Sequence, residues 1–128
     1  MRALLDTHLL IWIAGPSERL PTAVREIVDG DEYELYFSVA SLWEIAIKNS
    51  LGRADFEVDP GVLRRQFLDD EYVEVPVLGP HTVTVATLPP IHGDPFDRML
   101  VAQAITEGVE LFTVDRQLAR YPGPIRVF

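Results

Sequence analysis

Four acidic residues lie at or near the points where apolar segments end or amphipathic segments begin: Asp6, Glu44, Asp97 and Asp115. Two carboxylates about 4 Å apart repel by roughly 4 kcal/mol at an effective dielectric near 20, so several in one pocket require protonation or a cation. Oxygen ligands select hard ions, and Mg²⁺ usually binds one or two protein carboxylates, with water and substrate phosphate completing its shell. Such a group would fit metal-assisted phosphoryl chemistry.

Each of these acids also has a structural explanation when taken singly. Asp6 and Asp115 could cap the helices that follow them. Glu44 could pair with Lys48 one turn further on, or complete a capping box that begins at Ser41. The chemical interpretation therefore depends on whether the fold brings the acids together.

Residues 92–104 run from a loop into an amphipathic helix and contain two acids. Asp94, Pro95 and Asp97 fit an N-cap, a first-turn proline and an acid at the third helical position, where the positive end of the helix dipole favours negative charge. Taken alone, such a motif is more often a well-capped helix start than an active site. Asp94 is accordingly either the cap or an outer-sphere group of the site, and both alternatives stay open.

The elements that must position the acids alternate between strands and helices. Strands are predicted over residues 3–5, 34–38, 72–77, 110–114 and 125–128, and helices over 7–14, 21–28, the segment from Ser38 or Ser41 to Gly52, 60–68, 80–87, 95–107 and, as a single turn, 116–120. A turn is expected at Gly15-Pro16, and Pro76 favours an edge position for its strand. The alternation predicts the α/β class, with a mostly parallel sheet and helices on both faces.

In open α/β sheets the ligand site lies beyond the carboxyl ends of the strands. Asp6 and Asp115 follow two predicted strands, and the helix that carries Asp97 starts at the same edge. Glu44 lies one to one and a half turns into another helix that starts there, within side-chain reach. In that helix the apolar positions are 39, 42, 43, 46 and 47, which is a helical spacing. The topology thus predicts that the four acids converge.

Composition limits the possible classes of protein. A chain of 128 residues is best explained as one domain over residues 1–128. No apolar run approaches the roughly 20 residues of a membrane-spanning helix, and an acid interrupts any signal-like segment at the start, so we expect a cytoplasmic protein that does not enter a membrane.

The content of cysteine and histidine limits the metal chemistry. The absence of cysteine excludes disulfides, zinc–thiolate sites and cysteine nucleophiles. Three histidines, His8, His81 and His92, argue against a histidine-rich metal site. His8 and His92 lie near the acids in sequence, and we assign both a structural or loop role. Hard-cation chemistry remains open.

The net charge of −9 argues against a broad electrostatic grip on nucleic acid. Removing the four acids changes it to −5, which is still acidic. The chain has one lysine against ten arginines, so any grip on RNA must come from local arginines. We therefore expect weak, metal-dependent binding of a shaped or single-stranded RNA segment.

Four sequence pieces, in order, carry a resemblance to a known family. They are Leu-Asp-Thr-His-Leu-Leu-Ile-Trp at 5–12, Ser-Val-Ala-Ser-Leu-Trp-Glu-Ile at 38–45, residues 92–104 and Thr-Val-Asp at 113–115. The chain resembles PIN-domain proteins, and more closely the VapC-type toxins of bacterial toxin–antitoxin modules, over essentially its full length. The resemblance implies a PIN-like three-layer fold and a Mg²⁺-dependent endoribonuclease. Such an enzyme, the toxin of a type II module, hydrolyses RNA phosphodiesters by metal-activated water.

The resemblance also implies roles for the acids. The family's acidic quartet falls on Asp6, Glu44, Asp97 and Asp115. Asp6 and Asp97 would be the main ligands of Mg²⁺ or Mn²⁺. Glu44 and Asp115 would complete the acidic pocket, order water or support a second ion.

Neighbouring polar residues have two interpretations each. Thr7 and Thr113 flank acids and could fix the orientation of the carboxylates, or be ordinary polar residues at strand ends. Arg98 and Arg116 each follow a predicted ligand and could contact RNA phosphate, or be solvated surface arginines.

The resemblance further implies a homodimer, held inactive by an antitoxin. The C-terminal segment of the antitoxin would wrap the groove and place a basic side chain in the acidic site. Large apolar residues that could form such a surface, with burial in the core as the alternative for each, are Leu9, Ile11, Trp12, Leu42 and Trp43.

Three other functions remain possible from the sequence. A PIN ribonuclease could act outside any toxin–antitoxin module. A Mg²⁺-dependent phosphatase with an aspartyl nucleophile would also place acids at strand ends, and it would become covalently phosphorylated. A phosphoacceptor or metal-sensing module lacks support, because no lysine lies near the late strand to neutralise an acyl phosphate.

Overall fold

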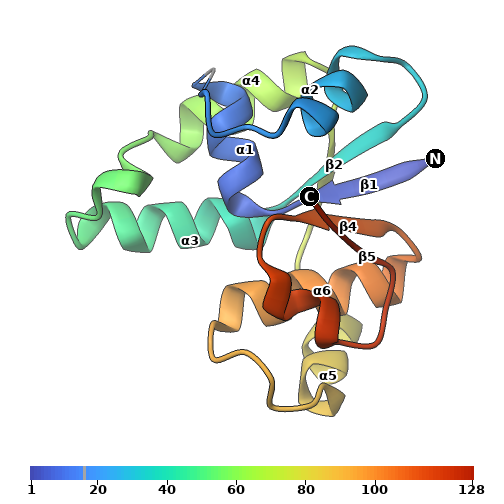
Figure 1. Cartoon of the computed structure of the whole chain (residues 1–128). Helices are drawn as coiled ribbons and strands as arrows, with labels where there is room; N and C mark the ends of the chain where they lie inside the picture. Colours follow the sequence, from blue (N-terminus) through green and yellow to red (C-terminus); the bar gives the residue numbers. More distant parts are fainter. Residues whose placement is uncertain (16) are drawn as a thin grey trace.

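The central sheet is parallel throughout. The computed structural model describes residues 1–15 and 17–128, and within them five strands form one sheet in the order β3-β2-β1-β4-β5 (Figure 1). The strands are β1 (Arg2–Leu5), β2 (Glu34–Ser38), β3 (Val73–Val75), β4 (Glu110–Thr113) and β5 (Ile125–Val127). The predicted edge position of the proline-bearing strand is confirmed, because β3 is an outer strand and Pro76 directly follows it.

Helices connect the strands and cover both faces of the sheet. They are α1 (Thr7–Ala14), α2 (Thr22–Asp29), α3 (Val39–Ser50), α4 (Pro60–Asp69), α5 (Gly79–Thr87) and α6 (Pro95–Glu107), with short 3₁₀ turns η1 (Ala54–Phe56) and η2 (Arg116–Arg120). Figure 1 shows α1, α2 and α4 on one side of the sheet and α5 and α6 on the other. The predicted α/β class and the three-layer arrangement, with helices on both faces of a parallel sheet, are confirmed. Of the turn predicted at Gly15-Pro16, Pro16 lies outside the described residues.

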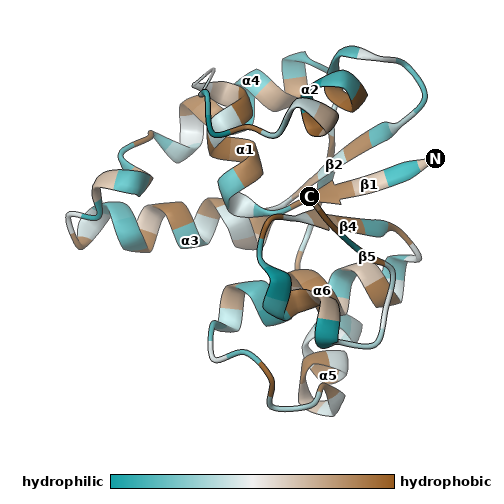
Figure 2. Cartoon of the chain, in the orientation of Figure 1, coloured by the Kyte–Doolittle hydropathy of each residue, from teal (hydrophilic) through white to brown (hydrophobic). Residues whose placement is uncertain are grey.

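Two apolar cores separate the three layers. Successive residues of β1 point to opposite faces, so Ala3 and Leu5 pack with α1, α2 and α4, whereas Leu4 packs with α6. In Figure 2 the strands are largely in hydrophobic colours, while much of the loop and outer helix surface is hydrophilic. Within the described part of the chain, no helix has the length and apolar character needed to cross a membrane.

The buried face of α3 does not coincide with its apolar positions. Ala40, Ser41, Glu44 and Ile45 are buried, whereas the side chain of Trp43 is 63% exposed. Apolar spacing was misleading here because the inner side of α3 contacts polar groups of α1 as well as the core. The N-cap is Ser38, whose hydroxyl accepts from the Ala40 N–H at 3.0 Å, and Ser41 lies inside the helix.

Strand register determines which residues meet at the carboxyl edge of the sheet. Leu5 pairs with Phe112, so the next residues, Asp6 and Thr113, lie side by side. The Asp6 N–H donates to the Phe112 carbonyl at 3.0 Å, which extends the β1–β4 pairing to the acid itself. Ser38, the last residue of β2, then starts α3 on the other side of β1. One edge of the sheet therefore receives residues from distant parts of the sequence.

Candidate metal centre

Asp6 is held rigidly at the end of β1. Its side chain caps α1 by accepting from the Leu9 N–H at 3.0 Å, and its other oxygen accepts from the Thr113 hydroxyl at 2.6 Å. The residue is only 4% exposed. Burial raises the pKa of this carboxyl, and the hydrogen bonds from Thr113 and Leu9 partly oppose the rise. Asp6 therefore caps α1 as predicted and lies at the carboxyl edge of the sheet beside the end of β4. Thr113 orients the carboxylate of Asp6, which was one of its two predicted roles.

Asp97 lies in the first turn of α6 and faces the other acids. Its side chain is 20% exposed. Burial, followed by the negative charges of Asp94, Glu44 and Asp6, raises its pKa to about 7. These residues therefore share one electrostatic environment, and a cation would relieve their mutual repulsion.

Glu44 is buried and fully engaged by protein donors. It lies about one and a half turns into α3 and is 3% exposed. The Thr7 hydroxyl donates to Oε1 at 2.5 Å and also lies 2.9 Å from the Ser41 hydroxyl. Lys48 donates to Oε2 at 2.5 Å, so the pairing one turn apart also occurs. Thr7 thus orients Glu44 in the way that Thr113 orients Asp6.

Asp115 forms the outer side of the acid group, together with a histidine. It caps η2, and its Oδ2 lies 2.8 Å from Nε2 of His92. His92 Nε2 is also 3.5 Å from Asp97 Oδ2. Because His92 Nδ1 accepts from the Asp94 N–H at 3.0 Å, the neutral ring carries its proton on Nε2 and donates it to Asp115.

His92 is the site residue that sequence reasoning missed. It was assigned a structural or loop role, and not a place in the site, yet one ligand atom each from His92, Asp97 and Asp115 lie within 4.8 Å of one another. Its tautomer makes it a hydrogen-bond donor to Asp115 rather than a metal ligand in this geometry. The available signal was its position two residues before the cap of α6.

The cap interpretation of Asp94 is confirmed. Its Oδ1 accepts from the N–H groups of Phe96 at 2.8 Å and Asp97 at 3.3 Å. Its Oδ2 lies 3.4 Å from Lys48 Nζ. Both oxygens therefore have partners in the described part of the chain, which favours the cap over an outer-sphere role.

The two arginines that follow predicted ligands differ from each other. Arg98 is partly buried and donates to the carbonyls of Pro89 at 2.9 Å and Val85 at 3.1 Å, and to the Tyr121 hydroxyl at 3.1 Å. It is neither a solvated surface arginine nor directed at a phosphate, because its guanidinium fixes the loop between α5 and α6. Arg116 is exposed beside Asp115.

His8 has the structural role that was predicted for it. Its ring packs against Trp12 and Phe56 with centroid distances of 5.7 and 5.3 Å, and Nε2 lies 3.6 Å from Asp55. The ring therefore joins α1 to the segment after α3.

An apolar cavity of about 460 Å³ lies next to the acids, between α3 and the start of α6. Trp43 and Phe96, which both line it, meet edge to face with ring centroids 5.3 Å apart. Of the five apolar residues considered for a partner surface, Leu9 is in the core and Ile11, Trp12 and Leu42 pack partly buried against it, so only Trp43 is largely exposed. The cavity is lined by Val39, Ala40, Trp43, Val77, Val85, Pro95, Phe96 and Met99.

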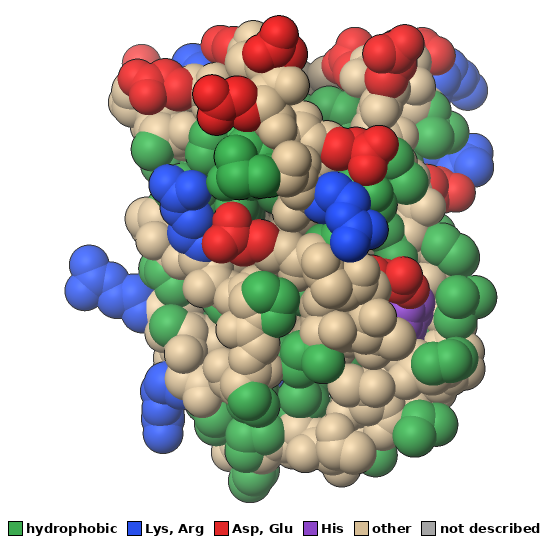
Figure 3. Space-filling view, turned by 90° about the vertical axis from the view of Figure 1, so that its right-hand side faces the viewer, with side chains coloured by type: hydrophobic (Ala, Val, Ile, Leu, Met, Phe, Trp, Pro, Cys, Tyr) green, Lys and Arg blue, Asp and Glu red, His purple; other side chains and the backbone are tan. Residues whose placement is uncertain are grey.

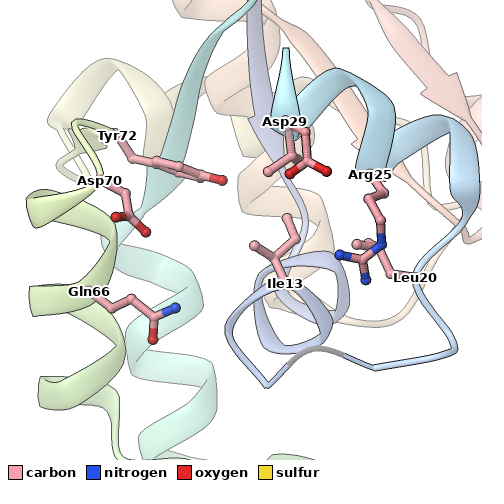
Figure 4. Close-up of a pocket in the computed structure, with 8 residues that line it drawn as sticks. Ile13, Leu20, Arg25, Asp29, Gln66, Asp70 and Tyr72 are labelled. Carbon is pink, nitrogen blue, oxygen red and sulfur yellow. The ribbon is translucent and has the colours of Figure 1, made fainter. Parts of the chain in front are cut away.

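A second cavity, of about 310 Å³, lies on the side of the sheet that carries α1, α2 and α4. Figure 4 shows Arg25 and Asp29 of α2 opposite Gln66 and the side chain of Tyr72 across this space. Burial raises the pKa of Tyr72 above its usual value. None of the four acids predicted as site residues lines this cavity.

The donor set fits a hard divalent ion. Asp97 and Asp115 offer carboxylate oxygens within 4.8 Å of each other, and the buried Asp6 adds a third carboxylate at the same edge of the sheet. Mg²⁺ and Mn²⁺ prefer such oxygen ligands. Burial is the main cause of the raised pKa of Asp97, and the negative charges of Asp94, Glu44 and Asp6 add to it. The surrounding donors, Thr113 and His92, hold carboxylates in fixed orientations, as metal sites require.

Comparison with known proteins agrees with the fold and the motifs. Residues 3–124 match the PIN domain family. Ribonuclease VapC22 of Mycobacterium tuberculosis is 30% identical over 128 residues, which cover 98% of this chain and 97% of that protein.

Two solved structures share the fold. One is VapBC2 from Rickettsia felis, bound to a DNA fragment from its promoter. It superposes with a TM-score of 0.70 at 14% sequence identity, and the match covers 100% of this chain and 99% of that one. DNA-bound VapBC from Salmonella typhimurium superposes with a TM-score of 0.67 at 18% sequence identity. The match covers 100% of this chain and 97% of that one. The family match, the relative and the shared fold lead to one conclusion: the chain belongs to the PIN domain family and, within it, to the VapC-like proteins.

Proposed function

We propose that this chain is a Mg²⁺- or Mn²⁺-dependent endoribonuclease, the toxin of a type II toxin–antitoxin module, which hydrolyses RNA phosphodiester bonds. The observation that carries the proposal is the gathering of acids at the carboxyl edge of the sheet. Ligand atoms of Asp97 and Asp115 lie within 4.8 Å of each other beside His92, and Asp6 lies next to Thr113 at the end of β1. The pKa of Asp97, raised first by burial and then by Asp94, Glu44 and Asp6, supports it. The 30% identical relative is named a ribonuclease, and the fold matches toxin–antitoxin complexes. These likenesses support the choice of RNA as substrate.

Asp6 and Asp97 are the main metal ligands in this proposal, and Glu44 and Asp115 complete the acidic pocket. A bound divalent ion supplies Lewis acidity, which lowers the pKa of a water and offsets negative charge on the phosphorus oxygens. The chain's own residues orient the carboxylates that hold the ion. Thr113 fixes Asp6 by its 2.6 Å hydrogen bond.

The test is RNA cleavage by purified protein with Mg²⁺, with Mn²⁺ and after chelation. Cleavage should require the ion, and Asp6→Asn or Asp97→Asn should reduce it by more than about 100-fold, the upper end of what outer-shell substitutions cause. Asp31→Asn is the matched control, because Asp31 is an exposed acid just before β2, at the opposite end of the strands. Ion-independent cleavage by the wild type would contradict the proposal.

An antitoxin partner follows from the same features. The acidic cluster would attract a basic side chain, and the apolar cavity beside it could hold apolar anchors of the same peptide. The solved neighbours are VapBC complexes, which supports this kind of partner. A small adjacent gene for a DNA-binding protein would distinguish a toxin from a PIN ribonuclease outside any module. The homodimer stays a prediction, which sedimentation equilibrium would test.

A further inference from the structure

Lys48, the sole lysine of the chain, is directed into the acidic cluster. Its Nζ lies 2.5 Å from Glu44 Oε2 and 3.4 Å from Asp94 Oδ2, and its side chain is only 17% exposed. The ammonium also lies 4.7 Å from the ring centroid of Phe56 and 5.8 Å from that of Phe96. Two carboxylates and two aromatic rings therefore hold this cation in one place.

The pairing leaves the charge of the cluster unevenly balanced. Both oxygens of Glu44 have protein donors, one of them the ammonium. Within residues 1–15 and 17–128, no lysine or arginine forms an ion pair with Asp6, Asp97 or Asp115. The charge of Glu44 is thus matched by Lys48, whereas the carboxylates at the ends of β1 and β4 have no lysine or arginine partner among the described residues.

We propose that Lys48 takes the place of a second divalent ion, so that the cluster binds one ion at Asp6, Asp97 and Asp115. Glu44 is then the charge partner of Lys48 and positions it, rather than acting as a ligand. A dication beside Glu44 would approach a partly buried ammonium, where a dielectric below that of water strengthens the repulsion. This inference rests on the proposed metal centre and specifies how many ions it holds.

The test is the number of Mn²⁺ ions bound per chain, measured on the full chain without RNA by titration calorimetry and by the electron paramagnetic resonance signal of free Mn²⁺. The wild type should bind one ion. Lys48→Met, which keeps an unbranched side chain but removes the charge, should bind two, because Glu44 and Asp94 become available. Lys48→Arg should still bind one ion, because arginine keeps the positive charge.

Two control variants separate the role of this pair from a general change of charge. Arg53→Met removes one positive charge from an exposed side chain near the end of α3 and should leave one ion bound. The double variant Glu44→Gln with Lys48→Met removes both partners and should also bind one ion. A second ion on Arg53→Met would mean that net charge alone sets the number of ions. A second ion on the double variant, whose net charge equals that of the wild type, would mean that Glu44 is not the ligand that Lys48 blocks.

Two ions on the wild type, or one ion on Lys48→Met, would overturn the inference. If Lys48→Met is unfolded without metal because Glu44 is left buried and unpaired, circular dichroism during the Mn²⁺ titration decides. Folding with two ions supports the role of Lys48, and folding with one ion, or failure to fold, contradicts it. No Mn²⁺ bound to the wild type, or unchanged binding by Asp97→Asn, would instead contradict the proposed metal centre itself.

Discussion

Asp97 shows how single residues acquire unusual properties from the fold. Its own position in the first turn of a helix favours a negative charge. Burial and three neighbouring carboxylates outweigh that preference and raise its pKa from 3.8 to about 7. The acids could be identified from the sequence. The pKa of Asp97 could not, because it depends on burial and on distances to other carboxylates, which only the structure shows.

The raised pKa of Asp97 predicts how stability depends on pH. Between about pH 4 and 7 the folded chain holds a proton that the unfolded chain has lost, so the contribution of Asp97 to stability falls as pH rises through this window. The full difference corresponds to roughly 4 kcal/mol at most. Asp97→Asn should therefore gain stability relative to the metal-free wild type at pH 8, and gain less at pH 5.

Urea unfolding in the presence of a chelator measures this difference. Adding Mg²⁺ at pH 8 should then stabilise the wild type and not Asp97→Asn, because only the wild type retains the ligand. Parallel pH profiles for the two proteins would show that Asp97 is not the group responsible.

The start of α6 shows how one element both stabilises the fold and presents a functional group. Asp94 caps the helix through two backbone N–H groups, one of them that of Asp97. Pro95 occupies the first turn, and Gly108, in the left-handed conformation at φ 66°, ends the helix. The cap therefore fixes the turn from which Asp97 reaches the other acids.

Substitution of Asp94 separates the cap from the charge. Asp94→Ala should lower the free energy of unfolding by about 1 kcal/mol, because both N–H groups lose their acceptor. Asp94→Asn should cost only a few tenths, because asparagine caps about as well as aspartate. Thermal or urea unfolding of the two variants provides the comparison. Equal losses would indicate that the contact with Lys48, rather than the cap, is what Asp94 contributes.

Elements were predictable where local pattern and packing agree. Each strand and helix range was close to correct, because short apolar runs and clear Gly, Pro and Asp boundaries mark them. The inner face of α3 could not be predicted from apolar spacing, because this face buries the polar residues Ser41 and Glu44 against α1. The roles of His92 and Arg98 were missed because each depends on partners far away in sequence, Asp115 and Tyr121.

Charge is distributed over the whole molecule as well as within the cluster. Figure 3 views the side on which β1 begins, and acidic side chains gather along its upper edge. The net charge of −9 argues against a broad electrostatic grip on RNA. Contact with a basic partner is easier to explain, and the proposed antitoxin surface includes the apolar cavity beside the acids.

Trp43 tests that partner surface. Its side chain is 63% exposed and lines the apolar cavity, so Trp43→Ala should weaken antitoxin binding by about 2 kcal/mol or more, as buried aromatic anchors do. Stability should change by less than about 0.5 kcal/mol. Val83→Ala, an equally exposed position on α5 that does not line the cavity, is the control. Calorimetry with the antitoxin and sedimentation of the free chain distinguish an antitoxin site from a dimer contact.

The central claim is that the convergent carboxylates hold an ion that enables RNA cleavage. The most direct test is cleavage of RNA by Asp6→Asn, purified free of contaminating nuclease, beside the wild type and Asp31→Asn in Mg²⁺ or Mn²⁺. The account predicts that Asp6→Asn keeps the fold and loses ion-dependent cleavage, while Asp31→Asn retains it. Cleavage by Asp6→Asn at the wild-type rate would contradict the account.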